Sequence, residues 1–261
     1  MRELFDEVYG QGGLDPEEAV RQSTRGPQRK RFYTRAGFSE TPDGFAITLD
    51  DKTVRTPSRK PLTAPERSIA EAIVAEWEAQ QDTINPTTMP LTRLANSVID
   101  AVGDNVTAVS DDIAKYFGTD LLFYRASHPQ ELVAREAQAW DPVLFWAAED
   151  FGAHFMLAEG IIHVQQPESS IAAARATLPN DPWTVAALHL VTTITGSALL
   201  ALAFLRGRLD ADQVWAAAHV DEDWNIERWG VDDEVASRRA AKLIDFRAAA
   251  RVVAALQSRS G

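Results

Sequence analysis

Residues 31–61 read RFYTRAGFSETPDGFAITLDDKTVRTPSRKP, and this stretch decides the fold class. Aromatic and β-branched residues alternate here with turn-forming residues, which is typical of short strands. Asp43-Gly44 favours a hairpin turn, and Asp50-Asp51-Lys52 favours a second one. A strand with one buried face is indicated by three apolar residues at alternate positions: Phe45, Ile47 and Leu49. The stretch therefore predicts a small antiparallel meander.

The pattern becomes helical after residue 62. Thr63-Ala-Pro-Glu66 matches a capping box, which predicts a helix start. Ile69, Ile73 and Trp77 follow at four-residue spacing, as on an apolar helix face. Similar runs continue to the end of the chain, although Asp141-Pro142 indicates a helix start or break.

The predicted fold class is therefore α+β, with a small antiparallel β-rich N-terminal domain and a larger α-helical C-terminal domain. Residues 1–30 are interpreted as a leader or linker with helical potential. The β-rich domain is expected over residues 31–62 and the helical domain over residues 63–261. If the first helix packs on the sheet, the border extends to about residue 90.

The charge and composition exclude several classes of protein. The 261 residues carry a formal net charge of −12, so a nucleic acid or an anionic membrane surface would repel the chain. The chain has no cysteine, which excludes disulfides, thiolate metal sites and cysteine nucleophiles. The acidic N-terminus lacks the apolar segment of a secretory signal. We expect neither a nucleic-acid partner nor a membrane partner.

One long apolar stretch requires a membrane test. Residues 183–205, WTVAALHLVTTITGSALLALAFL, contain no Asp, Glu, Lys or Arg and are long enough to span a bilayer. The stretch nevertheless contains a histidine, four threonines, a serine and a glycine. In a chain of otherwise ordinary composition, this pattern favours a buried helix or helix pair at the centre of the helical domain.

No catalytic motif stands out along the chain. The five histidines never fall three or four residues apart, and the chain contains no nucleophile elbow and no complete phosphate-binding loop. We therefore expect no catalytic residue, no metal, no cofactor and no small-molecule substrate.

The most unusual stretch is VDEDWNIERWGVDDE, residues 220–234, which holds seven carboxylates, two tryptophans and one arginine. A single helix through Gly230 would place Trp215, Glu222, Ile226 and Trp229 in one stripe. A carboxylate in an apolar stripe needs a basic partner, either Arg228 or Arg238 or a group on another protein. The plainer interpretation is a helix end with buried tryptophans and solvated acids. Calcium or magnesium binding is less favoured, because a rigid helix disperses the carboxylates.

Two stretches together resemble a known family. EWEAQQDTINPTTMPLTRLANSVID (residues 76–100) and residues 220–234 resemble signature regions of the ATP synthase F1-sector assembly chaperones, which bind the alpha subunit. Four further motifs follow the family's order: RFY (31–33), LDDKTVRTP (49–57), DLLFYRA (120–126) and WDPVLFWA (140–147).

The resemblance implies a fold and a function. Members have a small, mostly β N-terminal domain and a helical C-terminal domain. They bind the unassembled alpha subunit of the F-type ATP synthase headpiece, prevent its aggregation and release it on assembly with beta subunits. They are not enzymes and need no nucleotide. Eukaryotic members act in the mitochondrial matrix. Because this chain shows no convincing presequence, a bacterial cytoplasm is expected.

The resemblance makes Glu222 the candidate for the family's functionally important acidic position. The predicted partner-binding residues are Asp221, Glu222, Asp223, Trp224, Glu227 and Trp229. Glu222 is expected to pair with a basic group of the alpha subunit. Trp77 and Trp229 fall at helical spacing, and such tryptophans more often pack in a core.

Two other classes of function remain open. Asp221, Glu222 and Glu227 could supply the acid and base of a hydrolase with an unrecognised motif. Alternatively, the chain could be a scaffold subunit that stays in its complex permanently. Release of the alpha subunit when beta is added separates a chaperone from a scaffold.

Overall fold

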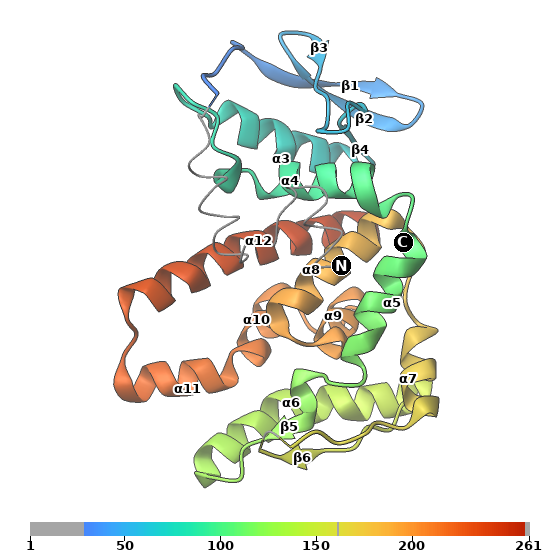
Figure 1. Cartoon of the computed structure of the whole chain (residues 1–261), viewed down its shortest axis with the longest axis vertical. Helices are drawn as coiled ribbons and strands as arrows, with labels where there is room; N and C mark the ends of the chain where they lie inside the picture. Colours follow the sequence, from blue (N-terminus) through green and yellow to red (C-terminus); the bar gives the residue numbers. More distant parts are fainter. Residues whose placement is uncertain (1–28, 161, 259–261) are drawn as a thin grey trace, which may run out of the picture. The chain divides into compact units, whose positions relative to one another are not determined.

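The structure, a computed structural model, describes residues 29–160 and 162–258 (Figure 1). The chain divides into two compact units, Met1–Asn105 with Ser258–Gly261 (unit 1) and Val106–Gln257 (unit 2). Unit 1 begins with a small antiparallel sheet, and helices dominate the rest of the described chain. The predicted α+β class is therefore confirmed. Nearly all of the leader expected over residues 1–30 lies outside the described residues.

The sheet of unit 1 is built around one central strand. Its strands are β1 (Ala36–Thr41), β2 (Gly44–Leu49), β3 (Lys52–Thr53) and β4 (Thr63–Ala64). β2 pairs antiparallel with the other three, which confirms the predicted meander. Of the three residues expected on the buried face of β2, Ile47 and Leu49 are buried and Phe45 is only partly buried, while Ala46, expected on the other face, is buried as well.

Both predicted hairpin turns form. Thr41 pairs with Gly44, so Pro42 and Asp43 make the first loop, one residue earlier than expected. Gly44 has φ +121, and a Cβ there would lie 2.4 Å from the Ala64 carbonyl oxygen, so only glycine fits. In the second loop Asp50 and Asp51 both have positive φ, as a type I′ turn requires.

The helices of unit 1 are α3 (Arg67–Glu78), the 3₁₀ turn η1 (Pro86–Thr88), α4 (Pro90–Ser97) and the π-helical turn η2 (Val98–Val102). Of these, α3 packs on this sheet and α4 packs against α3. The capping box expected at Thr63 is wrong, because Thr63 and Ala64 pair with β2 instead and α3 begins at Arg67. α3 buries Ile69 and Ile73, and the compact unit extends to Asn105. The borders expected at residue 62 or about 90 thus both lie inside unit 1.

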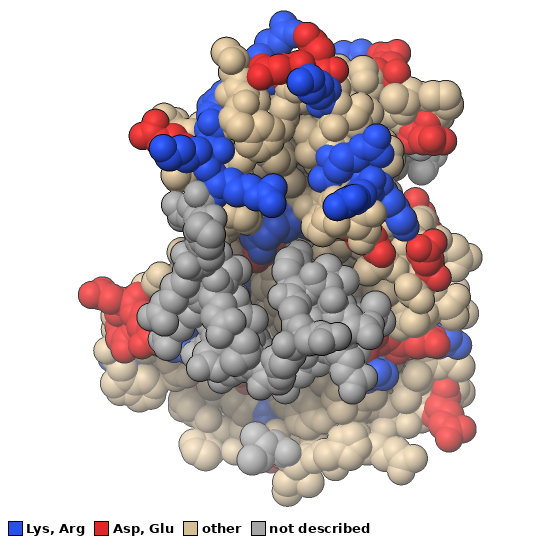
Figure 2. Space-filling model, turned by 45° about the horizontal axis from the view of Figure 1, so that its top comes forward, with Lys and Arg blue, Asp and Glu red and all other residues tan. Residues whose placement is uncertain are grey.

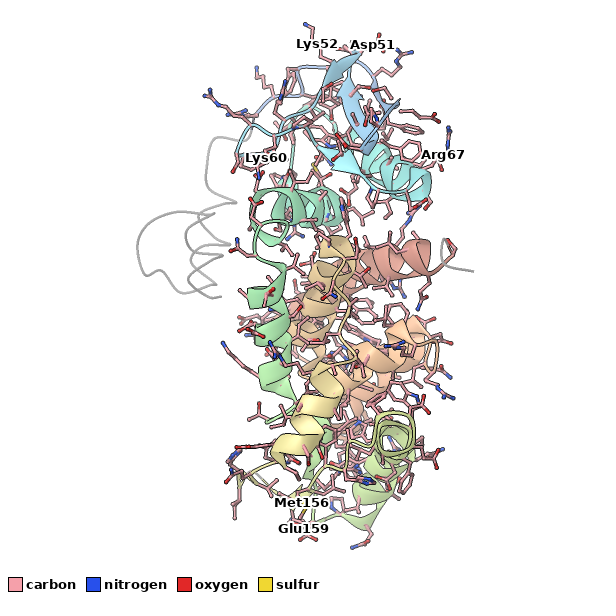
Figure 3. The ribbon with its side chains drawn as sticks, turned by 90° about the vertical axis from the view of Figure 1, so that its right-hand side faces the viewer. Asp51, Lys52, Lys60, Arg67, Met156 and Glu159 are labelled. Atoms are coloured by element: carbon pink, nitrogen blue, oxygen red, sulfur yellow. The ribbon has the colours of Figure 1, made fainter. Side chains whose placement is uncertain are left out.

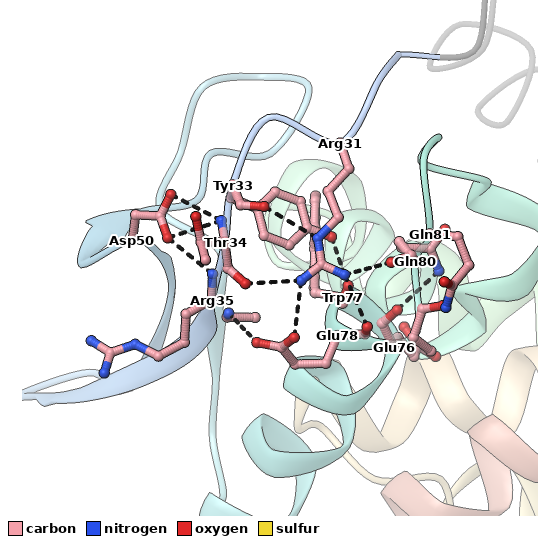
Figure 4. Close-up of polar contacts among 12 residues, drawn as sticks. Arg31, Tyr33, Thr34, Arg35, Asp50, Glu76, Trp77, Glu78, Gln80 and Gln81 are labelled. Carbon is pink, nitrogen blue, oxygen red and sulfur yellow. Dashed lines mark hydrogen bonds and ion pairs between the residues drawn. The ribbon is translucent and has the colours of Figure 1, made fainter.

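The signature stretch 76–100 is used to build unit 1. The Glu76 carboxylate accepts hydrogen bonds from the Leu91 and Thr92 amides (2.7 and 2.8 Å) and so caps α4. Arg31 donates to the Gln80 carbonyl and to the Glu78 carboxylate, which ties the RFY motif to α3 (Figure 4). This part of the family signature therefore has a structural role in the unit.

Unit 2 is a bundle of helices with one small ribbon. Its helices are α5 (Val106–Tyr116), α6 (Gln130–Phe151), α7 (Glu168–Arg175), α8 (Pro182–Thr195), α9 (Ala198–Leu205), α10 (Ala211–Ala218), α11 (Val220–Trp229) and α12 (Asp233–Gln257), with the 3₁₀ turn η3 (Leu121–Phe123). Strands β5 (Tyr124–Arg125) and β6 (Ala158–Glu159) pair in parallel.

The uncharged stretch 183–205 forms the centre of unit 2, as predicted. It folds as α8 and α9, which are separated at Gly196, and nearly every side chain of α9 is buried. α5 and α12 pack against α8. None of the described helices combines the length and the apolar character needed to cross a bilayer.

The break expected at Asp141-Pro142 does not occur, because α6 continues through Pro142. A proline inside a helix costs about 3 kcal/mol. Three neighbours that α6 buries offset this cost: Trp140, Val143 and Trp146.

Candidate partner-binding site

The acidic stretch begins at a break between two helices. One helix that carries Trp215, Ile226 and Trp229 was expected to run to Gly230, but His219 leaves the helical conformation (φ −121, ψ 22) between α10 and α11. Its ring stacks on Trp215, and its Nδ1–H donates to the Trp215 carbonyl at 2.7 Å. Trp215 therefore belongs to α10, and the expected stripe of Trp215, Glu222, Ile226 and Trp229 does not form.

The inner face of α11 packs against α6 and is joined to it by ion pairs. Trp224 is buried, with 3% of its surface exposed, and the guanidinium carbons of Arg228 and Arg135 lie 4.1 and 4.8 Å from its ring centroid. Arg135 of α6 binds Glu227 at 2.8 Å, and Arg228 binds Glu131 of α6 at 2.9 Å. Two ion pairs and a shared ring thus hold the two helices together.

The first turn of α11 is held by α12. Arg239 lies 2.5 Å from Asp223 and 3.8 Å from Glu222, whose carboxylate is also 3.7 Å from His219 Nε2. The basic neighbour that Glu222 required is therefore found inside the chain. Glu222 and Asp223 still expose 38% and 41% of their side chains, so a second basic group from outside can reach them.

Asp221 faces a buried acid. Glu136 of α6 is 1% exposed, and its carboxylate accepts a hydrogen bond from the Ala126 amide at 2.9 Å. Burial raises the pKa of Glu136 to about 7, and the neighbouring Asp221 carboxyl adds to this effect. The Glu136 carboxyl therefore keeps its proton up to about neutral pH.

Stability should depend on the protonation of Glu136. The unfolded-state pKa of about 4.5 lies below the folded-state value of about 7, so the stabilising contribution is lost as pH rises through that window. We expect the free energy of unfolding to fall by about 2 kcal/mol between about pH 5 and about pH 8 from this group. Urea unfolding at a series of pH values measures it.

Glu136→Gln is the control for this prediction. Its amide oxygen still accepts from Ala126, while its NH₂ donates permanently to Asp221. The pH dependence should therefore flatten relative to wild type. Burial also raises the pKa of Asp120, to about 6, but Asp120 contributes equally in both proteins. Parallel pH profiles for wild type and variant would show that Glu136 does not titrate in this range.

The outer face of α11 carries a different stripe from the one expected. Asp221, Asn225 and Trp229 are exposed at four-residue intervals, and Trp229 exposes 76% of its surface. Gly230 then turns the chain, and Val231 beyond it is 46% exposed. The expectation that Trp229 packs in the core is therefore wrong. We call Asp221, Asn225, Trp229 and Val231 the outer stripe.

Arginines engage most of the carboxylates of this site. Over residues 29–160 and 162–258, no three His, Asp or Glu side chains lie where they could hold a metal ion together. Glu222 and Glu227 are paired with arginines, and the carboxyl with the raised pKa is out of reach of a substrate. Arg135, Glu136 and Arg239 were missed in the sequence because they come from α6 and α12. The i,i+4 pair Glu131–Arg135 was the one local signal for a charged face on α6.

Comparisons with known proteins agree on one family. Residues 30–148 match the family described as ATP12 chaperone protein. The mitochondrial protein atp12 of Schizosaccharomyces pombe is 21% identical over 217 residues, which cover 78% of this chain and 75% of that protein.

Two solved bacterial structures are more similar. The Atu1473 protein of Agrobacterium tumefaciens is 44% identical with a TM-score of 0.83, over 98% of this chain and 97% of that one. Atp12 of Paracoccus denitrificans is 39% identical with a TM-score of 0.77, over 86% of this chain and 97% of that one. With this identity over nearly the whole of a solved relative, the chain belongs to the ATP12 family of assembly chaperones.

Proposed function

We propose that this protein binds the unassembled alpha subunit of the F-type ATP synthase, keeps it from aggregating and releases it when alpha assembles with beta. Membership of the ATP12 family and the ordered sequence motifs support this role. An unassembled subunit exposes an interface that its neighbours normally cover, and such apolar patches aggregate. The proposed partner is this subunit, and no nucleic acid, membrane or small molecule is required. The proposed location is a bacterial cytoplasm or a mitochondrial matrix.

The observation that carries the proposal is the exposure of Trp229. The Trp229 indole exposes 76% of its surface, and its helix α11 is fixed by ion pairs to α6 and to α12. Its exposure is therefore not that of a side chain on a mobile tail. A fixed, exposed tryptophan loses little conformational freedom when a partner covers it, which is typical of an interface anchor. We assign the direct contact to the outer stripe. Trp224, which is buried, supports the helix from inside.

The acids of α11 give the surface its charge. Residues 106–257 of unit 2 include twelve Lys and Arg but twenty-one Asp and Glu. The described residues 29–105 are nearly balanced, with ten basic and eleven acidic side chains, and Figure 2 shows Lys and Arg gathered over unit 1. Unit 2 therefore attracts a basic partner surface and accelerates its approach. In this proposal Glu222, Asp223 and Glu227 steer the partner while their arginines hold the helix.

Replacing Glu222 with glutamine should slow association without abolishing binding. Arg239 lies close to Glu222 and partly compensates its negative charge. Removal of this charge therefore weakens the electrostatic attraction of a basic partner only in part. We expect the association rate with purified alpha subunit to fall about threefold at low salt and to match wild type at high salt. Glu234→Gln, at the exposed start of α12, is the matched control. Unchanged association at low salt would remove Glu222 from the docking surface.

Co-expression tests the proposed function directly. This chain and alpha alone should yield an isolable complex, and added beta should dissolve it. A complex that survives beta would make the protein a permanent scaffold subunit. Failure to retain alpha at all would contradict the proposal. A reproducible hydrolytic turnover that is lost in Asp221→Asn would favour the hydrolase instead. Glu136, the neighbour of Asp221, is only 1% exposed, so it offers little surface to a substrate.

A further inference from the structure

The chain from His154 to Met156 is held in place by buried groups. The side chain of Gln166, which is 4% exposed, accepts from the Met156 amide (2.8 Å) and donates to the Met156 carbonyl (2.9 Å). Ser170 donates to the His154 carbonyl at 2.6 Å, and Phe155 stacks on the buried Phe123 at 4.7 Å. The backbone that leads into β6 is therefore fixed by its neighbours.

Apolar side chains in this segment and in the chain just beyond β6 are exposed to solvent. Met156, Leu157 and Ile162 expose 52%, 48% and 76% of their surface. Figure 3 shows Met156 and Glu159 at the surface of unit 2, on the segment that includes β6. Exposed apolar groups gathered in one short segment mark a site of interaction more often than isolated ones do.

The same segment presents an open strand edge. Over the described residues, β5 and β6 form a ribbon of two strands, and the Gly160 amide extends it by donating to Arg125. On the side of β5 away from β6, the Glu136 carboxylate accepts from the Ala126 amide, so the open edge is that of β6, which no other described strand covers. Unpaired backbone groups beside apolar side chains form a template on which a further strand can pair.

We infer that the open edge of the β5–β6 ribbon, with Met156, Leu157 and Ile162, is a docking strand for an extended apolar segment of a client chain. The strand edge would supply backbone hydrogen bonds, and the three side chains would supply apolar contact. The inference rests on the family's chaperone role and on this ribbon. It does not depend on the outer stripe of α11 or on the identity of the alpha subunit.

A second copy of the chain fits this edge poorly. A stable interface buries about 800 Å² on each partner, whereas three partly exposed side chains offer at most about 400 Å². Two copies of unit 2 also repel each other, because each carries twenty-one acidic and twelve basic residues over 106–257. A short segment that binds weakly matches both the small area and the need for release.

The test uses a labelled nine-residue peptide of alternating valine and threonine, with lysine at both ends, and the full-length chain. Fluorescence anisotropy should report saturable binding that Leu157→Asn and Ile162→Asn each weaken by about tenfold. Ile244→Asn, at an exposed isoleucine on α12, is the matched control and should bind as wild type. Circular dichroism should give equal melting temperatures for all three variants, because the substituted side chains are exposed.

A second peptide, N-methylated at alternate residues, separates strand addition from general stickiness. It keeps the side chains but cannot complete a hydrogen-bond ladder, so it should not bind measurably. Equal binding of both peptides would overturn the inference, and so would equal binding by Ile162→Asn and wild type. Amide exchange at Leu157 and Glu159 should be fast in the free chain, whereas the Gly160 amide, which donates to Arg125, should be protected. Strong protection at Leu157 and Glu159, or dimers that Leu157→Asn dissociates, would show that the chain itself covers the edge.

Discussion

Replacing Trp229 with serine is expected to weaken binding of the alpha subunit by at least about 30-fold. The indole exposes 76% of its surface in the free protein, so a partner that covers it gains most of its apolar area. Serine removes that area and leaves the helix end soluble. Titration calorimetry or surface plasmon resonance with purified alpha subunit measures the change in Kd.

The free energy of unfolding should not fall in the same variant. Trp229 lies at the last position of α11 and gives up few internal contacts, so its replacement changes stability by less than about 0.5 kcal/mol. This separates loss of a contact from loss of the fold.

Ile244→Ser is the matched control for this variant. Ile244 is also a large, exposed apolar residue of unit 2, but it lies on α12 and outside the outer stripe. It should bind alpha as wild type does. Equal Kd values for Trp229→Ser and wild type would move the docking surface away from α11. A loss in both variants would point to general apolar adhesion instead.

The fold was predictable where its causes are local. The two hairpin turns are properties of neighbouring residues, and the structure contains both. The uncharged stretch 183–205 was likewise predictable. Because it was not expected to span a membrane, its apolar side chains had to be buried inside the protein, and most of them are. The error at Thr63 has the opposite cause. Thr63 and Ala64 carry a helix-capping pattern, but pairing with the distant Phe45 and Ala46 decides their conformation.

The candidate site was predictable in its acids and not in its geometry. Glu227 and its partner Arg135 are 92 residues apart, so no local pattern connects them. The break at His219 also resets the helical phase between Trp215 and the acids. Trp224 turns inward and Trp229 outward because five residues separate them on α11, although both stood in the same stretch as candidate contacts. Asp221, Asn225 and Trp229 are spaced four residues apart, so helical spacing that starts at Asp221 places all three on one face. The composition of the stretch gave no reason to choose Asp221 as the start.

The largest effect on stability is expected for Trp224→Ala. This residue is 3% exposed, and truncation of a buried tryptophan costs about 3–5 kcal/mol. The variant also loses the ring that Arg135 and Arg228 share, so two guanidinium groups remain close to each other without the π surface between them. Chemical unfolding followed by circular dichroism measures the loss, and the melting temperature should fall by about 10 °C.

Trp224→Phe keeps this prediction testable if the alanine variant fails to fold. Phenylalanine retains an aromatic face for the two arginines and most of the buried area, so about 1–2 kcal/mol should be lost. Because Trp224 supports α11 from inside and does not touch the partner, this folded variant should keep nearly all of its affinity for alpha. Trp229 should behave in the reverse manner, with affinity lost and stability kept. If Trp224→Phe is as stable as wild type but binds alpha poorly, then Trp224 itself meets the partner and α11 must move to expose it.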